Sequence, residues 1–295
     1  MLTRQRGHAA ARPGTRRRYY VLWCWPLIVV CLCWQPRFAR AELSRTRSGT
    51  ALHWSVNEIV LIQVDRGVEN SVIPATALHE SLEAGVAAWN RATSSCRVPR
   101  LVLASRRETR SWHRQDGRNL VSVVTQGDCR VDSDAPDLCG DPHTAARTAL
   151  YPISAPGTPR DGLVQEADIE LNAARFRWAS DDAPSTAHLH RAILHELGHV
   201  LGLSHPCSFT VTGRRSCKDE LYTNALMNPE AAVLHGPVAL TPGAAEVNEL
   251  CELYGRKPKA SVPSARHTRS MHMEFAKLFL IVLALGLPLT ILRRY

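Results

Sequence analysis

The most constraining feature of this 295-residue chain is the run at residues 195–205, which has the pattern H-E-x-x-H-x-x-G-x-x-H. On a helix of 3.6 residues per turn, His195 and His199 lie about 40° apart around the axis and about 6 Å apart along it. Both imidazoles can therefore reach one metal ion from a single helical face. Gly202 lets the chain break and turn, and this turn would return His205 as a third ligand.

This pattern predicts a catalytic metal site. Three protein ligands leave the fourth position of a tetrahedral zinc ion open to water, which distinguishes a catalytic from a structural site. Glu196 lies one step around the helix from the ligands, within reach of that water. We therefore expect one Zn²⁺ held by His195, His199 and His205, with Glu196 as the catalytic general base.

A methionine in a turn-like context follows the histidines: Met227 lies in the run A-L-M-N-P, 22 residues beyond His205. In the order of these elements the sequence resembles metzincin zinc peptidases, most closely matrixin-type and matrixin-like bacterial peptidases. The resemblance covers roughly residues 49–255. It implies that Met227 forms a packed turn beneath the three histidines and is not a ligand.

The same resemblance implies an α+β fold of the metzincin zincin type. A mixed twisted sheet and the active-site helix would form an upper lobe, and a small lower lobe would carry a C-terminal helix. A substrate cleft would lie between the lobes, with the peptide paired antiparallel to an edge strand. The implied activity is that of a zinc-dependent endopeptidase, in which Glu196 activates a zinc-bound water to hydrolyse a protein or peptide substrate.

Two other functions stay open. One is a catalytically idle metzincin scaffold that acts as a surface-binding module; the retention of Glu196 beside all three ligands speaks against it. The other is an enzyme that processes one dedicated surface partner. Residues 206–226 favour this second reading, because matrixins have only a short loop between the third histidine and the methionine. We expect this insertion, with Pro206 and two cysteines, to shape the substrate pocket.

The formal net charge of +9 is concentrated at the two ends of the chain. Residues 1–41 carry +8 and residues 255–295 carry +7, which leaves −6 for the residues between them. An acidic central region lacks the basic surface that nucleic-acid binding requires, so we predict no nucleic-acid partner.

Both ends have features of membrane targeting. Residues 1–41 combine a basic leader, an apolar stretch and an A-x-A pattern, which predicts a signal peptide ahead of a catalytic domain at 42–255. After a basic linker at 256–274, the apolar run 275–292 predicts a transmembrane helix, and residues 293–295 a cytoplasmic basic end. We expect the catalytic domain outside the membrane, anchored by this helix or secreted if the tail is removed.

Six cysteines remain beyond the predicted signal peptide, an even number in an exported domain, and this favours disulfides over zinc ligation. Fifteen pairings are conceivable. Short loops favour Cys129–Cys139 and Cys207–Cys217, which would leave Cys96 to pair with Cys251.

Several other residues are candidate metal ligands. His188 and His190 precede the zinc motif, and we expect them to be packed or solvated side chains of the helix. An acidic loop offers a second, structural Ca²⁺ site as the alternative to a solvated surface. Its residues are Asp132, Asp134, Asp137, Asp141 and His143.

Periodicity predicts one sheet and three main helices in the globular part. A buried strand is expected at 58–65, an amphipathic helix at 75–93, and strands at 100–104, 119–125, 145–151 and 166–172. The last two would form a hairpin. The active-site helix is expected to start at a cap on Ser185 or Thr186 and to run to Leu201, and the final helix to start at a cap on Thr241.

Overall fold

The sheet and the helices behind it are seen in a computed structural model of the chain. The structure describes residues 41–105, 115–126, 138, 143–179, 187–208, 216–231, 233 and 240–258. The predicted signal peptide, linker and C-terminal transmembrane helix lie outside these ranges, apart from Ala41 and residues 256–258. So do Ser185, Thr186 and the four aspartates of the acidic loop. None of the helices in the described ranges has the length and apolar character needed to cross a membrane.

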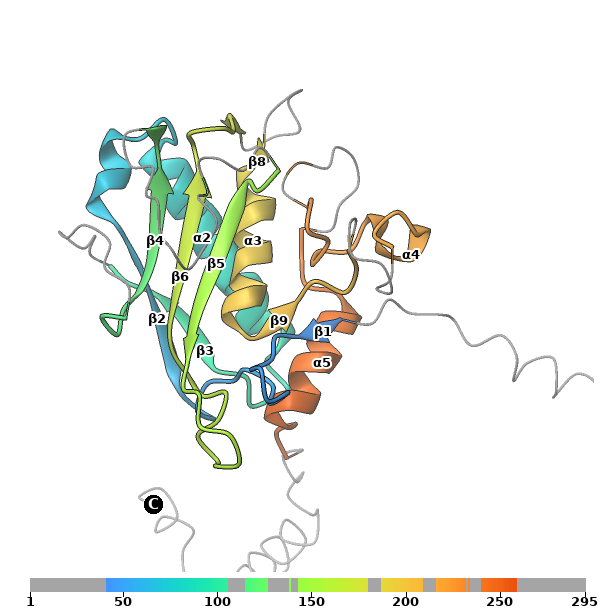
Figure 1. The fold of residues 1–295 in the computed structure, drawn as a ribbon. Coiled ribbons are helices and arrows are strands. Elements are labelled where there is room, and N and C mark those ends of the chain that lie inside the picture. The colour runs from blue at the N-terminus through green and yellow to red at the C-terminus, as the bar shows by residue number, and fades with distance from the viewer. Residues whose placement is uncertain are drawn as a thin grey trace, which may run out of the picture.

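The fold is α+β and is built on one mixed, twisted five-stranded sheet with the order β3-β2-β4-β6-β5 (Figure 1). The first four strands of this order run parallel, and β5 runs antiparallel to β6 at the edge. This confirms the predicted hairpin. The strands are β2 (Ile59–Val64), β3 (Arg100–Leu103), β4 (Asn119–Val124), β5 (Ala146–Pro152) and β6 (Val164–Asn172).

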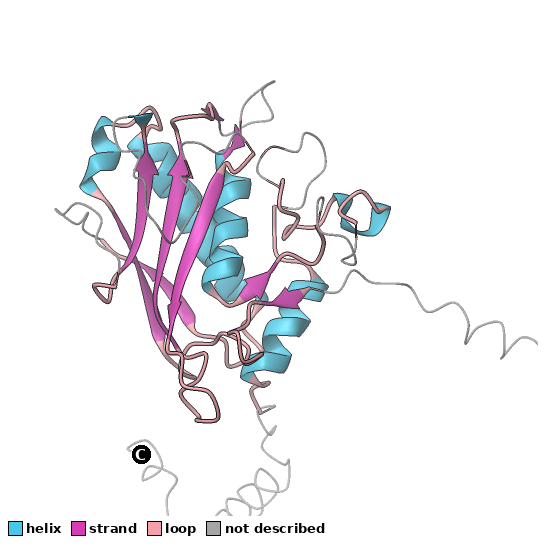
Figure 2. Ribbon diagram, viewed as in Figure 1, coloured by secondary structure: helices cyan, strands magenta, loops and turns pink. Residues whose placement is uncertain are grey.

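Two long helices, α2 (Ala75–Ala92) and α3 (Leu189–Val200), lie together on one face of this sheet (Figures 1 and 2). The apolar positions of α2 at helical spacing are all buried, which confirms the predicted amphipathic helix. They are Leu78, Leu82, Val86 and Trp89. Together with α3 and the inner side of the sheet they form the main hydrophobic core, so α3 packs against both α2 and the strands.

One face of β2 is open to solvent: Ile59 is 63% exposed and Leu61 is 43% exposed, whereas Val60, Ile62 and Val64 are buried. The predicted strand at 58–65 is therefore present, but the prediction that it is buried is correct only for alternate residues. An unbroken apolar run cannot by itself distinguish one covered face from two.

The remaining elements surround the C-terminal end of α3. The chain leaving α3 forms β9 (Leu203–Ser204), which pairs antiparallel with the N-terminal β1 (Glu42–Leu43). Beyond it lie α4 (Glu220–Thr223) and α5 (Ala244–Tyr254), on the side of α3 away from the main sheet (Figure 1). Short elements complete the fold: η1 (Arg66–Asn70), β7 (Trp178–Ala179) and β8 (Ala187–His188).

Two helices begin later than the sequence suggested. The N-cap of α3 is His188, whose Nδ1 accepts a hydrogen bond from the backbone N–H of Arg191. The N-cap of α5 is Gly243, not Thr241. The Glu246 carboxylate folds back to within 2.8 Å of where a Cβ on Gly243 would stand, so a glycine fits this cap and a side-chain cap is crowded out.

Two of the favoured disulfides are present. Cys96 and Cys251 join the end of α2 to α5, and Cys207 and Cys217 close a ten-residue separation after the third histidine. These two pairings are confirmed, and the favoured Cys129–Cys139 pair lies outside the described residues.

A pair of buried carboxylates lies on β6. The Glu166 carboxylate accepts two 2.6 Å hydrogen bonds from the backbone N–H groups of Gln115 and Gly117. Asp168 is 1% exposed and accepts one bond, at 3.0 Å, from the backbone N–H of Leu120, while its Oδ2 has no hydrogen-bond partner. Burial, reinforced by the charge of Glu166, raises the pKa of Asp168 to about 8.

This raised pKa predicts a stabilising substitution. The unfolded chain loses the Asp168 proton near pH 4 and the folded protein near pH 8, so wild-type stability should fall as the pH rises between these values. Asp168→Asn keeps the acceptor for Leu120 and cannot ionise. We expect Asp168→Asn to stabilise the fold by about 1–2 kcal/mol at pH 8, which raises the thermal midpoint by a few degrees, because the variant no longer favours the unfolded state by ionising at this position.

Thermal unfolding between pH 4 and pH 8 tests this, with exposed Glu252→Gln as the control. The gain of Asp168→Asn should shrink toward pH 4. If the stability of Asp168→Asn changes with pH in the same way as that of the wild type, the raised pKa assigned to Asp168 is wrong.

Candidate metal centre

Helix α3 presents the first two histidines on one face, as the spacing predicts. His195 is buried within the helix and His199 lies one turn later, four residues from the point where β9 begins. Gly202 has φ +105°, in the region that favours glycine, and there the chain reverses. His205 follows β9 directly and faces the other two rings.

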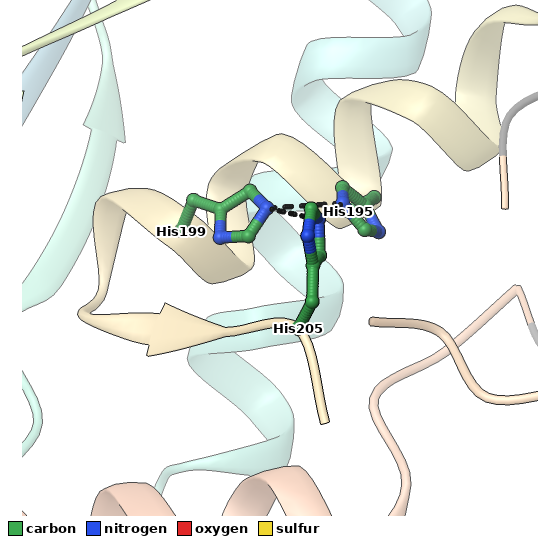
Figure 3. A group of neighbouring side chains, drawn as sticks. All are labelled: His195, His199 and His205. Carbon is green, nitrogen blue, oxygen red and sulfur yellow. Dashed lines mark hydrogen bonds between the residues drawn. The ribbon is translucent and has the colours of Figure 1, made fainter. Parts of the chain in front are cut away.

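The three imidazoles point their Nε2 atoms toward one another (Figure 3). The Nε2 atom of His199 lies 3.0 Å from Nε2 of both His195 and His205, and the remaining Nε2–Nε2 distance is 3.1 Å. An ion at the usual zinc–nitrogen distance of about 2.05 Å from all three would stand about 1 Å out of their plane. This cluster could hold a metal ion.

Backbone carbonyl groups fix the protonation of two of the rings. His195 Nδ1 lies 2.7 Å from the carbonyl oxygen of Leu226, and His199 Nδ1 lies 2.8 Å from that of Leu203. A carbonyl oxygen can only accept, so each Nδ1 must carry a proton and donate it. Each Nε2 of a neutral ring then presents a lone pair to the shared point. Converging lone pairs repel one another, and a cation between them removes that repulsion.

Electrostatics keeps these rings neutral. Burial, together with the neighbouring His199 and His205, holds the pKa of His195 well below its ordinary value. Burial likewise lowers the pKa of His199. Neutral imidazole is the form that ligates metals, so the donor set and its protonation both fit Zn²⁺.

Glu196 lies next to the cluster and is oriented by a residue of the edge strand. It is buried, and the Thr148 hydroxyl on β5 donates a 2.6 Å hydrogen bond to its Oε2. Burial raises the pKa of Glu196 to about 7, and the bond from Thr148 opposes that rise. Sequence reasoning missed Thr148, because it precedes Glu196 by 48 residues and only the packing of β5 against α3 brings the two together.

Met227 lies directly against the active-site helix. It is completely buried, and a Cβ added to Gly198 would come within 2.7 Å of its Sδ. Gly198 lies between the two helical ligands, so the thioether fills the space that a glycine leaves on that turn. Its neighbour Leu226 supplies the carbonyl that binds His195. The turn at 225–228 therefore supports the first ligand twice, by packing and by a hydrogen bond.

Between His205 and Met227 the described chain is held by its own small core. Cys207 and Cys217 form their disulfide against buried Tyr222, apart from the main core. The Asn228 side chain donates to the carbonyl oxygen of Tyr222, at 3.1 Å, which ties this core to the turn below the histidines.

His188 and His190, which were also candidate ligands, are not part of the cluster. His188 is the N-cap of α3, in line with the prediction of a packed residue. His190 is half-buried, and desolvation lowers its pKa. The Ca²⁺ prediction falls on aspartates outside the described residues and stays a prediction. No protein-family model matches the sequence, and no curated protein matches it.

The convergence of the rings predicts that each histidine is needed for metal binding. Purified wild type should bind one Zn²⁺ or Co²⁺. His199→Ala should bind none, because the two remaining imidazoles are too few protein ligands to hold the ion. Elemental analysis and the visible absorption of bound Co²⁺ measure this. His79→Ala, on the exposed face of α2, is the matched control. Equal metal content in His199→Ala would refute the cluster as the site.

The contact between Gly198 and Met227 predicts a second result. Gly198→Ala should destabilise the protein by about 1–3 kcal/mol, because its methyl group overlaps Met227 Sδ and stands 3.0 Å from Trp89 Cζ2. Adding Met227→Ala should recover part of this loss. Chemical denaturation of the two single variants and the double variant tests the coupling, and strictly additive effects would show that the two positions are not in contact.

Proposed function

We propose that this chain is a zinc-dependent endopeptidase with the metzincin fold, resembling the matrixin-type peptidases, and that Glu196 is its general base. The observation that carries the proposal is the convergence of three imidazole Nε2 atoms, with the buried carboxylate of Glu196 on the same helix. A structural zinc site would close its fourth position with a protein ligand, and among the described residues the candidate ligand group consists of the three histidines alone.

The chemistry divides between the metal and Glu196. Bound Zn²⁺ would supply Lewis acidity, lowering the pKa of a coordinated water and polarising the substrate carbonyl. Glu196 would remove the proton from the attacking water and pass it to the leaving amine. Thr148 engages one carboxylate oxygen, Oε2, which leaves Oε1 to meet the water.

The position of β5 favours a peptide as the substrate. In the described part of the chain, β5 ends the sheet order and pairs only with β6. Its remaining edge can hydrogen-bond an extended peptide, and the Thr148 contact places that edge beside Glu196. Backbone pairing of this kind would hold the scissile bond near the metal, while the stapled segment after His205 would select side chains.

The proposal includes an exported location. Two disulfides are typical of a protein that folds in an oxidising compartment. We propose that residues 1–41 are removed as a signal peptide and that residues 275–292 anchor the catalytic domain outside the membrane. The acidic character of the central region supports a protein or peptide substrate over nucleic acid.

Peptidase activity is tested with the purified full-length chain and a random peptide library. The wild type should cut the library, and a zinc chelator should abolish the cutting. Glu196→Gln should bind zinc as the wild type does yet lose about 10²- to 10⁴-fold in kcat/KM, because it cannot take a proton. Glu83→Gln, which is 63% exposed on α2, should cut normally.

The other outcomes separate the competing functions. Undiminished turnover by Glu196→Gln would contradict the general-base role. Zinc binding without cleavage of any peptide would favour an idle scaffold that binds surfaces, and a single cut in one native partner would favour a dedicated processing enzyme.

A further inference from the structure

The N-terminal segment pairs with and hydrogen-bonds to the turn between the second and the third histidine. We call residues 200–204 the ligand turn and residues 42–54 the N-terminal strap. Strand β1 of the strap pairs antiparallel with β9 of the ligand turn, one residue before His205. The two segments are about 160 residues apart in sequence: the Ser44–Leu203 contact has a separation of 159.

The start of the ligand turn is held by two aromatic side chains. Trp54 is 3% exposed, and its indole Nε1–H donates a 2.7 Å hydrogen bond to the carbonyl oxygen of Val200. The Tyr254 hydroxyl, from the end of α5, donates at 3.1 Å to the carbonyl oxygen of Leu201 and accepts from the backbone N–H of Trp54. These bonds satisfy carbonyl groups that the end of α3 would otherwise leave unpaired.

The rest of the turn is held by Ser44. Its backbone N–H donates at 2.8 Å to the carbonyl oxygen of Gly202, and its hydroxyl donates at 3.1 Å to that of Leu203. The Leu203 carbonyl is also the acceptor that fixes the Nδ1 proton of His199. Ser44 and His199 therefore both donate a hydrogen bond to the same atom, the carbonyl oxygen of Leu203.

The strap also explains the glycine of the motif. A Cβ at Gly202 would stand 2.7 Å from the carbonyl oxygen of Leu52 in the strap. Glycine is thus required twice, by its positive φ and by the close approach of the strap.

The middle of the strap is anchored independently of the metal centre. Buried Asp161, in the β5–β6 connection, accepts 2.6 Å hydrogen bonds from the hydroxyls of Ser48 and Thr50, and a 3.0 Å bond from the backbone N–H of Ala155. The hydroxyls of Ser48 and Thr50 lower the pKa of Asp161, so it is ionised at neutral pH. The strap is therefore fixed to the β5–β6 connection independently of its contacts with the ligand turn.

We propose that the N-terminal strap and Tyr254 set the affinity of the metal centre by fixing the position of His205. Ser44, Trp54 and Tyr254 are positioning residues that act through the carbonyl groups of the ligand turn. The proposal rests on the proposed function in one respect only, namely that the histidine cluster binds zinc. A site whose third ligand is held in place pays less ordering entropy when the ion binds, so loosening the turn weakens binding.

The test measures the zinc Kd of the full-length chain by competition with a chromophoric chelator. Trp54→Phe keeps the ring and removes the indole donor, Tyr254→Phe removes the hydroxyl, and Ser44→Ala removes the bond to Leu203. Outer-shell partners of metal ligands are worth about 10- to 100-fold in affinity, so we expect about tenfold weaker binding for each aromatic variant and a smaller loss for Ser44→Ala. The visible spectrum of bound Co²⁺ should change as His205 moves.

Trp178→Phe is the matched control, because its indole donates to the carbonyl oxygen of Asn172, at 3.2 Å, and not to the ligand turn. It should bind zinc as the wild type does. A lower thermal midpoint of the metal-free variants with an unchanged zinc Kd would show that the strap serves only the fold, and would overturn the proposal. If Trp54→Phe does not fold, Ser44→Ala and Tyr254→Phe decide. A wild type that binds no zinc would instead refute the proposed function, and this inference with it.

Discussion

Two backbone carbonyl oxygens govern the chemistry of the histidine cluster. By accepting the Nδ1 protons of His195 and His199, Leu226 and Leu203 direct the lone pairs of both rings to one point. Hydrogen-bond acceptors on the far side of a ligand also raise its basicity. Both carbonyls belong to segments that follow α3, Leu203 to β9 and Leu226 to the turn at 225–228. The chain after the helix must therefore be in place before the histidines can act as a set.

The position of α3 is fixed by its contacts with α2. The indole of Trp89 in α2 donates a 2.9 Å hydrogen bond to the carbonyl oxygen of Leu194, the residue before the first ligand. Gly85 lets the two helices approach closely, since a Cβ there would stand 3.0 Å from a methyl group of Leu197. A close, hydrogen-bonded contact between helices fixes the rotation of α3 about its axis. That rotation decides where His195 and His199 point.

Local patterns predicted the elements well, and long-range contacts were beyond them. The apolar spacing of α2 and the eleven-residue motif are properties of consecutive residues, so the helix, its buried face and the histidine cluster could be anticipated. The cap at His188 was missed because a histidine is a rare cap and serines precede it nearby. Thr148 and Trp54 could not be found, because their roles depend on which distant segment packs beside α3, and a single sequence carries no signal for that pairing.

The hydrogen bond between Trp54 and Tyr254 joins residues 200 positions apart. A polypeptide is made from its N-terminus, so the strap is synthesised long before Tyr254. Contacts this distant form late, because the entropy lost in closing so long a loop must be offset by other contacts already formed. The contact with Tyr254 is consequently among the last to form, and a partly synthesised chain that already contains all three histidines still lacks the hydrogen bond from Tyr254 to the carbonyl oxygen of Leu201.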